Sequence, residues 1–353
     1  MPITPVQQAE LDAPPGTQGK SYLLPFVLVT SLFFLWGMAN ILNGALIAHF
    51  QPVFDIPRAL ALLVETAFYL GYFTIAIPAG LFMEKFNYKK GILFGLILYA
   101  AGALLFIPAA KLLTFGFFLF ALYVIASGLA FLETAANPYV TILGRPETSV
   151  MRLNFSQSFN GVALIVGPVL ASKFIFAGNE GDLSSLEAKR QAADAVVGPY
   201  VAIAVVVLLV ALFFSLTKMP EPAKGEKLRF NKAIFKHRHL VFAVIAQLFY
   251  VGAQAGIWGI TIDYVVELIP GTSKETASGV FLLIGTSLFV TGRFLGTFLM
   301  MFIKDHRLLT LYAGAAALLC AAGIFASGEV AVYAVLGTNF LCPSCSPPSL
   351  LWA

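Results

Sequence analysis

Long apolar runs separated by short polar segments dominate this sequence. Each run has about 20 residues or more, the length at which an α-helix crosses the hydrocarbon core of a bilayer. We therefore predict an all-α polytopic membrane protein with nine complete transmembrane helices and part of a tenth, which begins at about Val330. The nine are expected near residues 23–50, 59–82, 91–109, 112–137, 155–178, 196–217, 239–262, 278–302 and 308–328.

The composition excludes a water-soluble protein. Of the 353 residues, 59% are hydrophobic and only 11% are charged, whereas about a quarter of the residues of a soluble chain are charged. The expected partner of most of the surface is the lipid bilayer. The net charge of +4 is small and lies mainly on one side of the membrane, so nucleic-acid binding has no support. Three cysteines are too few and too badly placed for a disulfide scaffold or a zinc site.

Lysine and arginine are unevenly distributed between the two sides of the predicted helices. Counted from a cytosolic N-terminus, the even-numbered loops hold most of the basic residues, and the odd-numbered loops balance theirs with acids. The positive-inside rule then places the N-terminus in the cytosol. We expect a multi-pass monomer in the cell inner (plasma) membrane.

The chain divides at two polar segments. Residues 1–22 are proline-rich and lack the features of a signal peptide, so we expect a disordered cytosolic tail. Residues 218–238 are polar and basic, and we expect them to be a cytosolic linker. The linker separates a six-helix N-terminal half, 23–217, from an incomplete C-terminal half, 239–339.

A weak internal repeat favours two parallel halves. Residues 33–37 (Phe-Phe-Leu-Trp-Gly) resemble residues 248–252 (Leu-Phe-Tyr-Val-Gly). Residues 79–82 (Ala-Gly-Leu-Phe) resemble residues 295–298 (Leu-Gly-Thr-Phe). The offset between the paired segments is almost identical in the two cases, and a shared offset is what duplicated halves produce.

The loop between the second and third predicted helices carries a charged motif. A glycine lets two helices approach closely, a carboxylate can pair with basic residues, and asparagine tolerates a left-handed turn. The pattern resembles the Gly-x-x-x-Asp-Arg-x-Gly-x-Arg-Arg signature of the major facilitator superfamily, although an ordinary basic loop is the alternative. The residues of this cytosolic gate motif are Gly80, Glu84, Lys85, Lys89 and Lys90, with Asn87 at the turn.

Glu133 lies deep in the fourth predicted helix. An ionised carboxylate at that depth is costly unless it faces water, a partner or a substrate, and such a group can carry a proton. Asn137 follows one turn later on the same face, and Pro138 frees a backbone carbonyl. We predict a functional polar face, with a structural hydrogen bond between helices as the alternative.

Four segments together resemble the fucose:proton symporter family of the major facilitator superfamily. They are residues 132–138 (Leu-Glu-Thr-Ala-Ala-Asn-Pro), 154–160, which we expect to open the fifth helix, 69–80 and 250–258. The resemblance implies twelve helices, alternating access and a sugar site at mid-membrane between the halves. It also implies that Glu133 is the family's helix-4 glutamate and that Gln157 and Asn160 are its helix-5 amides.

The residues themselves agree with a sugar site. Sugar hydroxyls require hydrogen-bond donors and acceptors, and the apolar face of a sugar favours an aromatic ring. Amides in membrane helices also join helices to one another, which is the alternative for each of them. The predicted substrate ligands are Asn40, Asn43, Asn137, Gln157, Asn160 and Gln254, with Trp36, Tyr250 and Trp258 as candidate aromatic partners.

One position departs from the family. The family's helix-1 pattern Asn-x-Leu-Asn-Asp ends in an aspartate linked with proton coupling, whereas this chain has Gly44 there. Glu65 stands in the second helix where the family pattern has a glutamine. We hypothesise that Glu65 takes over part of the missing role and pairs with Glu133. The rival hypothesis is that Glu65 is a lone residue at a helix end and that coupling is lost or changed.

The remaining charged residues do not indicate an enzyme. Arg293 matches the family's eighth helix and is expected to have a structural role near the cytosolic end, where it can snorkel or pair across a gate. The four histidines lack metal-ligand company, and neither a phosphate-binding glycine loop nor a Ser-His-Asp order is present. We expect no cofactor and no metal.

The last residues do not read as a membrane helix. Residues 340–353 contain three prolines, which break a helix interior. A codon string that encodes this stretch gives, after a shift of one base, an apolar sequence that resembles the family's tenth helix. We hypothesise a frameshift near Phe340, which would leave the C-terminal half without helices 10 to 12.

These observations predict transport of a sugar, L-fucose or a related hexose, by proton symport with alternating access. Protonation of Glu133 would neutralise it and so permit the loaded carrier to reorient. Two alternatives stay open, a proton-independent sugar facilitator and a non-transporting truncated product or sugar sensor.

Overall fold

The computed structural model describes residues 22–175, 185–220, 238–273 and 276–341, and every regular element within these ranges is a helix. The longer helices form two groups in chain order. The N-terminal group comprises α2 (Leu23–Phe54), α3 (Arg58–Ala61), α4 (Leu63–Phe86), α5 (Tyr88–Leu104), α6 (Phe106–Leu112), α7 (Phe115–Ile142), α8 (Ser149–Leu170), α9 (Leu186–Ala195) and α10 (Val197–Leu216). The C-terminal group comprises α11 (Arg238–Leu268), α13 (Leu282–Leu299), α14 (Asp305–Phe325) and α15 (Gly328–Leu341).

The apolar runs of the sequence form these helices. Within the described residues, seven helical segments are long and apolar enough to cross a membrane, and three shorter apolar helices accompany them. Each of the ten overlaps one run predicted from the sequence. The all-α, polytopic membrane architecture is therefore confirmed, and the protein is a multi-pass membrane protein.

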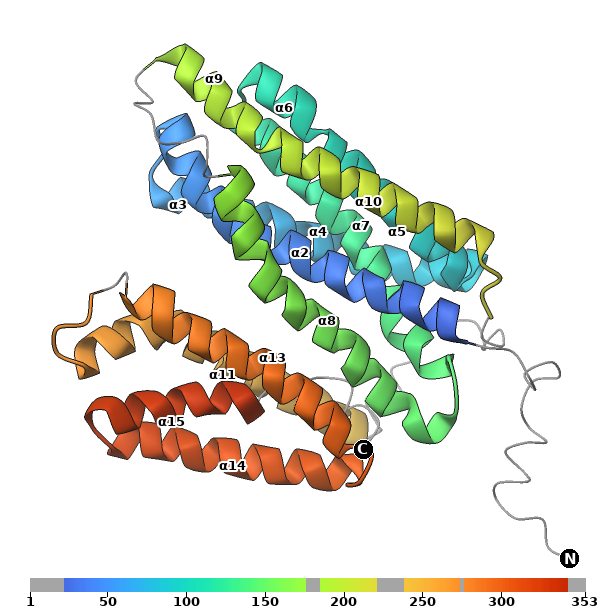
Figure 1. Ribbon diagram of the computed structural model, residues 1–353. Coiled ribbons are helices and arrows are strands. Elements are labelled where there is room, and N and C mark those ends of the chain that lie inside the picture. The colour runs from blue at the N-terminus through green and yellow to red at the C-terminus, as the bar shows by residue number, and fades with distance from the viewer. Residues whose placement is uncertain (1–21, 176–184, 221–237, 274–275, 342–353) are drawn as a thin grey trace, which may run out of the picture.

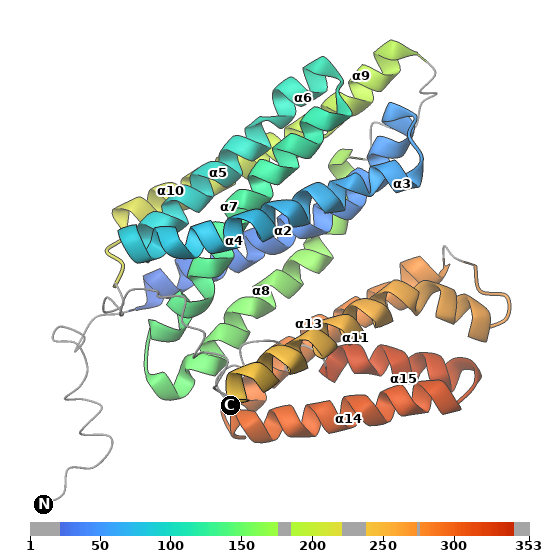
Figure 2. The same ribbon diagram turned by 180° about the vertical axis from the view of Figure 1, so that it is seen from behind.

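The two helix groups lie side by side, and α8 of the first group faces α13 of the second (Figures 1 and 2). From this contact the groups separate toward the end of the molecule at which α3 and α9 lie. The contact is built from the first turns and the middle of α8, because Asn154 and Gly161 meet Thr297 and Val290 of α13. The groups are thus joined at one end and apart at the other.

Helix boundaries recur along the chain at a nearly constant offset. The starts of α11, α14 and α15 follow those of α2, α5 and α7 at almost the same offset as the short sequence repeat. The packing recurs as well, because α7 packs against α4 and α5, and α15 packs in the same way against α13 and α14. The repeat of the sequence therefore reappears in the arrangement of whole helices.

Two glycines set how closely the N-terminal helices approach. A Cβ on Gly128 of α7 would stand 2.5 Å from the carbonyl oxygen of Gly95 on α5. A Cβ on Gly37 of α2 would stand 2.8 Å from the carbonyl oxygen of Asn160 on α8. Backbones can approach this closely only where no side chain intervenes. Gly80, which we expected to allow a close approach, does not do so, since no described atom lies within 4 Å of the place of its Cβ.

The start of α8 differs from the expectation. It begins at Ser149 rather than near 155, so the 154–160 run lies inside the helix and does not open it. Arg152 explains the difference, because its guanidinium donates to the carbonyls of Val140 and Thr141 at the end of α7 (3.3 and 2.6 Å). Polar residues at the start of α8 therefore have partners and need not form a loop.

A short helix that the sequence did not predict covers one end of the N-terminal group. Helix α9 is capped by Ser185, whose hydroxyl accepts a hydrogen bond from the backbone N–H of Ala188 (3.1 Å). His49 of α2 is hydrogen-bonded to the carbonyl of Ala192 on α9 (2.9 Å). The predicted tail (1–22), linker (218–238) and C-terminal stretch (340–353) lie almost entirely outside the described residues.

Candidate functional site

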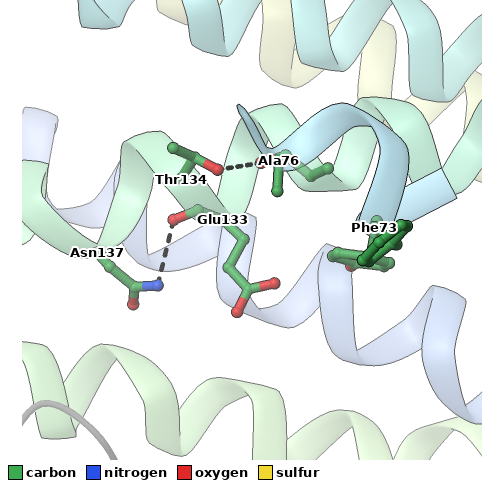
Figure 3. A pocket seen from close by; sticks show the side chains of 7 residues that line it. Phe73, Ala76, Glu133, Thr134 and Asn137 are labelled. Carbon is green, nitrogen blue, oxygen red and sulfur yellow. Dashed lines mark hydrogen bonds between the residues drawn. The ribbon is translucent and has the colours of Figure 1, made fainter. Parts of the chain in front are cut away.

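Glu133 lines a cavity of about 460 Å³ between α4 and α7. Its carboxylate points away from the α7 backbone into this space (Figure 3). No hydrogen bond to the carboxylate is present in the described part of the chain. The acid is thus available to a ligand, and it is not sealed among packed side chains. The cavity is lined by Tyr72, Phe73 and Ala76 of α4 and by Ala130, Glu133, Thr134 and Asn137 of α7.

The polar residues beside Glu133 are held by their own helix. The Thr134 hydroxyl donates to the carbonyl of Ala130 (2.7 Å), and Asn137 Nδ2 donates to the carbonyl of Glu133 (3.2 Å) (Figure 3). These bonds fix the side chains within a helix that Pro138 interrupts without ending. The Oδ1 atom of Asn137 then accepts from Gln157 Nε2 of α8 (3.4 Å). The predicted polar face of α7 is therefore present and reaches α8.

Tyr72 and its neighbour Trp36 each carry a buried donor without a hydrogen-bond partner of good geometry among the described residues. The Tyr72 hydroxyl interacts electrostatically with Glu133 and lies beside Trp36 of α2. Neither this hydroxyl nor the indole Nε1 of Trp36 forms a hydrogen bond of acceptable geometry within the described residues. Buried donors without an acceptor are costly. Neither atom is exposed to the cavity in this conformation, so a polar ligand reaches them only when a neighbouring side chain moves.

A second set of polar contacts lies nearer the start of α4. The hydroxyl of Tyr69 interacts with the amide of Asn40 and, electrostatically, with Glu65. Positions 65, 69, 72 and 76 share one face of the helix, since they are spaced by three or four residues. One face of α4 thus runs from Glu65 in its first turn to the cavity of Glu133.

Glu65 does not line that cavity. It is half-buried, and its Oε2 atom has no hydrogen-bond partner among the described residues. Tyr72 follows it by seven positions, which is about 10 Å along a helix. The predicted direct pairing of Glu65 with Glu133 is therefore not supported by its position. On α4, Tyr69 and Tyr72 lie between Glu65 and the part of the helix that faces Glu133 of α7.

The other predicted ligands lie in different places. Asn43 is fully buried in the packed side of α2, and neither of its amide atoms has a partner in the described structure. Asn160 is half-buried, and its backbone packs against Gly37. Tyr250 of α11 packs beside Leu308 and interacts electrostatically with Arg293. Gln254 is half-buried on α11, and the side chain of Trp258 lies outside the described residues.

The charged motif between α4 and α5 forms a turn that reaches α10. Asn87 has a left-handed φ of 100°, as predicted, and its side chain accepts a hydrogen bond from the N–H of Lys90 (2.9 Å). Lys89 Nζ donates to the carbonyls of Ser215 and Thr217 (2.9 and 2.8 Å). A lysine is favourable there because helix C-termini carry unpaired carbonyls and partial negative charge. Glu84, Lys85 and Lys90 are exposed.

Arg293 is buried, and it does not reach for solvent. It is 7% exposed, and its Nη1 atom donates to the carbonyl of Gln157 across the boundary of the two helix groups (3.0 Å). The expectation of a snorkelling side chain is therefore wrong. The other expectation, a contact across the two groups, agrees with this hydrogen bond.

Sequence reasoning missed Tyr72 and Phe73 as cavity residues. Both lie in an apolar helix where aromatic side chains suggest packing, and only the spacing Glu65, Tyr69, Tyr72 sets this face apart. Phe73 is 82% exposed, so its ring is free to contact a ligand or lipid. No cluster of three His, Cys, Asp or Glu side chains that could hold a metal ion occurs among the described residues.

Comparison with known proteins gives a consistent result. The sequence model of the Major Facilitator Superfamily matches residues 28–351. The L-fucose-proton symporter of Escherichia coli (strain K12) is 41% identical over 337 residues, which cover 90% of this chain and 76% of that protein. The glucose/galactose transporter of Brucella abortus (strain 2308) is 34% identical over 320 residues, with the same coverage of 90% and 76%.

Solved structures agree with the sequence matches. The crystal structure of the major facilitator transporter FucP in the outward conformation superposes with a TM-score of 0.83 at 39% identity, and the match covers 94% of this chain and 84% of that one. The proton:xylose symporter XylE superposes with a TM-score of 0.66 at 14% identity, with 94% of this chain and 81% of that one covered, which indicates a shared fold alone.

Proposed function

This chain belongs to the Major Facilitator Superfamily, and from that premise we propose that it carries a sugar, L-fucose or a related hexose, across a membrane together with a proton. The observation that carries the proposal is the Glu133 carboxylate, which has no hydrogen-bond partner among the described residues and is directed into the cavity between α4 and α7. The cavity volume of about 460 Å³ falls within the range of small-molecule sites. The L-fucose-proton symporter of Escherichia coli supports the substrate class.

The cavity offers what a sugar requires. Glu133 accepts hydrogen bonds from sugar hydroxyls, and the buried Tyr72 hydroxyl and the neighbouring Trp36 N–H, which have no partner among the described residues, donate to sugar oxygens after a local side-chain movement. The Phe73 ring covers an apolar face of the sugar ring, because it is largely exposed at the cavity. Asn137 lines the cavity and accepts a hydrogen bond from Gln157 of α8. The described lining of this cavity lacks the other proposed ligands, Trp36, Asn40, Asn43, Gln157, Asn160, Tyr250 and Gln254. Trp258 also remains a proposed ligand, although its side chain lies outside the described residues.

Glu133 also couples the sugar to the proton. A charged carboxylate at membrane depth opposes movement of the site away from water. Protonation neutralises the acid, so the carrier loaded with sugar and proton reorients without a buried net charge at this position. After the sugar and the proton leave on the other side, the carboxylate is charged again, and water in the emptied cavity solvates it while the carrier returns. Glu65 contributes through the Tyr69–Tyr72 face of α4.

The two helix groups supply the alternating access. We place the halves at 23–217 and 239–339, joined by a cytosolic linker at 218–238, in a monomer with a cytosolic N-terminus in the inner membrane. The groups touch along α8 and α13 and separate toward α3 and α9 (Figures 1 and 2). This arrangement presents the cavity to the outer side. Opening of the α8–α13 contact would present it to the cytosol.

A proton-independent sugar facilitator is the second candidate. Gly44 favours it, because this position is exposed beside open space and holds no carboxylate. The two candidates make different predictions about proton movement with the sugar.

Purified protein in liposomes separates them. External pH is recorded after addition of L-fucose, D-galactose or D-glucose to vesicles without a pH gradient. A symporter makes the medium alkaline when its sugar enters, and a facilitator takes up radiolabelled sugar with no change in pH. Glu133→Gln abolishes alkalinisation under symport, whereas Glu187→Gln on the exposed surface of α9 is the matched control and has no effect. Absence of uptake of every sugar tested would refute both candidates.

A further inference from the structure

Arg293 is a buried cation at the boundary between the helix groups. Its Nη1 atom donates to the Gln157 carbonyl of α8 (3.0 Å), and its guanidinium lies over the ring of Phe289 at 5.0 Å. Its Nε atom has no hydrogen-bond partner within the described residues. The side chain is 7% exposed. The guanidinium is therefore only partly satisfied by its surroundings.

No carboxylate in the described part of the chain compensates this charge. The guanidinium interacts electrostatically with the hydroxyl of Tyr250 on α11. A carbonyl and a ring face stabilise a cation less than an ion pair with full hydrogen bonding does. A buried charge without an opposite charge opposes the arrangement that buries it.

The same boundary is otherwise well packed. Asn154 Nδ2 donates to Thr297 Oγ1 (2.8 Å), and Gly161 leaves room for Val290 of α13. The ring of Phe294 contacts that of Phe159 with centroids 6.2 Å apart. Favourable packing and an unfavourable charge thus act on one contact in opposite directions.

A chain of hydrogen bonds connects this contact with the cavity. Arg293 donates to the main-chain carbonyl of Gln157, and the side-chain Nε2 of Gln157 donates to Asn137 Oδ1 (3.4 Å). Asn137 Nδ2 in turn donates to the main-chain carbonyl of Glu133 (3.2 Å). A ligand that engages the amides of Asn137 and Gln157 therefore acts on the residue that Arg293 holds.

We propose that Arg293 is the positioning residue that transmits the state of the Glu133 cavity to the α8–α13 contact and keeps that contact separable. The proposal rests on the proposed transport function. Arg293 holds Gln157 in place while the groups are joined. When the contact opens, water reaches the guanidinium, and its hydration offsets the packing that is lost. Without the charge, the contact stays closed and the carrier still binds its sugar but does not reorient.

Arg293→Met and Arg293→Lys test this role in the full-length protein, with L-fucose as the probe. The Met variant is expected to bind L-fucose within about twofold of the wild-type Kd while its uptake turnover falls at least about tenfold. The Lys variant keeps a charge that water can reach, so its turnover is expected within about threefold of wild type. Elution as a single species and an unchanged Tm establish that each variant is folded.

Spin labels read the contact directly and do not depend on transport. Cysteines replace Glu147 before α8 and Met301 after α13, and serine replaces the native cysteines. Distances between the labels are expected in two populations in the wild type, and only in the shorter population in the Met variant. If sugar uptake is absent from the wild type but the two populations are present, the transport proposal fails and the role of Arg293 at the contact stands.

Three results would overturn the proposal. The first is wild-type turnover in the Met variant, and the second is a parallel loss of binding and turnover in a variant that is folded. The third is a folded Lys variant as slow as the Met variant, because the charge would then not be the property that matters. If the Met variant does not fold, the Lys variant and its label distances decide.

Discussion

The carboxamide of Asn137 is hydrogen-bonded to that of Gln157 at 3.4 Å, and this bond joins the face of α7 that carries Glu133 to the helix that contacts the other half of the molecule. Cavity and interface are consequently one connected structure. Substitutions near Glu133 should for this reason be separable into those that alter the ligand and those that alter the scaffold.

Tyr72 and Tyr99 offer such a separation. Tyr72→Phe removes a buried hydroxyl that has no partner in the described structure, so we expect unchanged or slightly raised thermal stability and weaker sugar binding. Tyr99→Phe removes a hydrogen bond to the Leu35 carbonyl (3.2 Å) and should cost about 1 kcal/mol with little effect on binding. Thermal melting and L-fucose titration of both variants measure the two effects. A Tyr72 variant that binds sugar as the wild type does would remove this hydroxyl from the site.

The same substitution at two glycines of α2 is expected to have different effects on stability. Gly44→Asp places a carboxylate in open space, because no described atom lies within 4 Å of the added Cβ. The variant should fold normally and show uptake with a changed dependence on external pH. Gly37→Asp drives the added Cβ toward the Asn160 carbonyl at 2.8 Å and should destabilise the protein by about 1–3 kcal/mol. Equal Tm losses in both variants would contradict the placement of Gly44 beside open space.

The role of Glu65 is testable with its amide counterpart. Glu65→Gln keeps the shape of a half-buried side chain but cannot release a proton. We expect proton-driven uptake to fall while exchange of sugar between equal concentrations persists, because exchange requires no net proton transfer. Proton-driven uptake at the wild-type level in the Glu65→Gln variant would show that Glu65 has no role in proton coupling.

Close contact between α5 and α7 predicts a stability effect far from the ligand. Gly128→Ala inserts a methyl group 2.5 Å from the Gly95 carbonyl and 2.6 Å from the Tyr99 backbone nitrogen, at a cost of about 1–3 kcal/mol. Gly198→Ala, in the first turn of α10 before Pro199, meets no described atom of another segment within 4 Å and should cost less stability than Gly128→Ala. Melting temperatures in one detergent compare the two, and a Gly128 variant as stable as the Gly198 variant would argue against this helix contact.

The helices were predictable because membrane spans require long apolar runs, and no other signal was needed. The turn at Asn87 was predictable as well, since few non-glycine residues adopt its positive φ. The start of α8 was not, because it depends on the contact of Arg152 with the end of α7, which lies beyond any local pattern. Short helix α9 was missed for a similar reason, as it packs on His49 from a polar segment.

The site was predictable only in part. Glu133 and Asn137 stand out because polar residues in an apolar helix need a reason, and both line the cavity. Asn40 and Asn43 look alike in sequence, yet one meets Tyr69 and the other is fully buried. A difference of three positions turns a side chain by about 60° around the helix, and packing decides which of the two faces the cavity. Tyr72 was missed because its hydroxyl gives no signal among so many aromatic residues.

The offset that aligns Gly80 with Gly296 also aligns Ile77 with Arg293. Ile77 is 74% exposed and uncharged, whereas Arg293 is a cation enclosed between helices. The architecture of the two groups is thus duplicated, but their chemistry is not. Arg293 thus has no charged counterpart at the aligned position of the N-terminal group, and under the proposed role this difference biases the carrier between its two orientations.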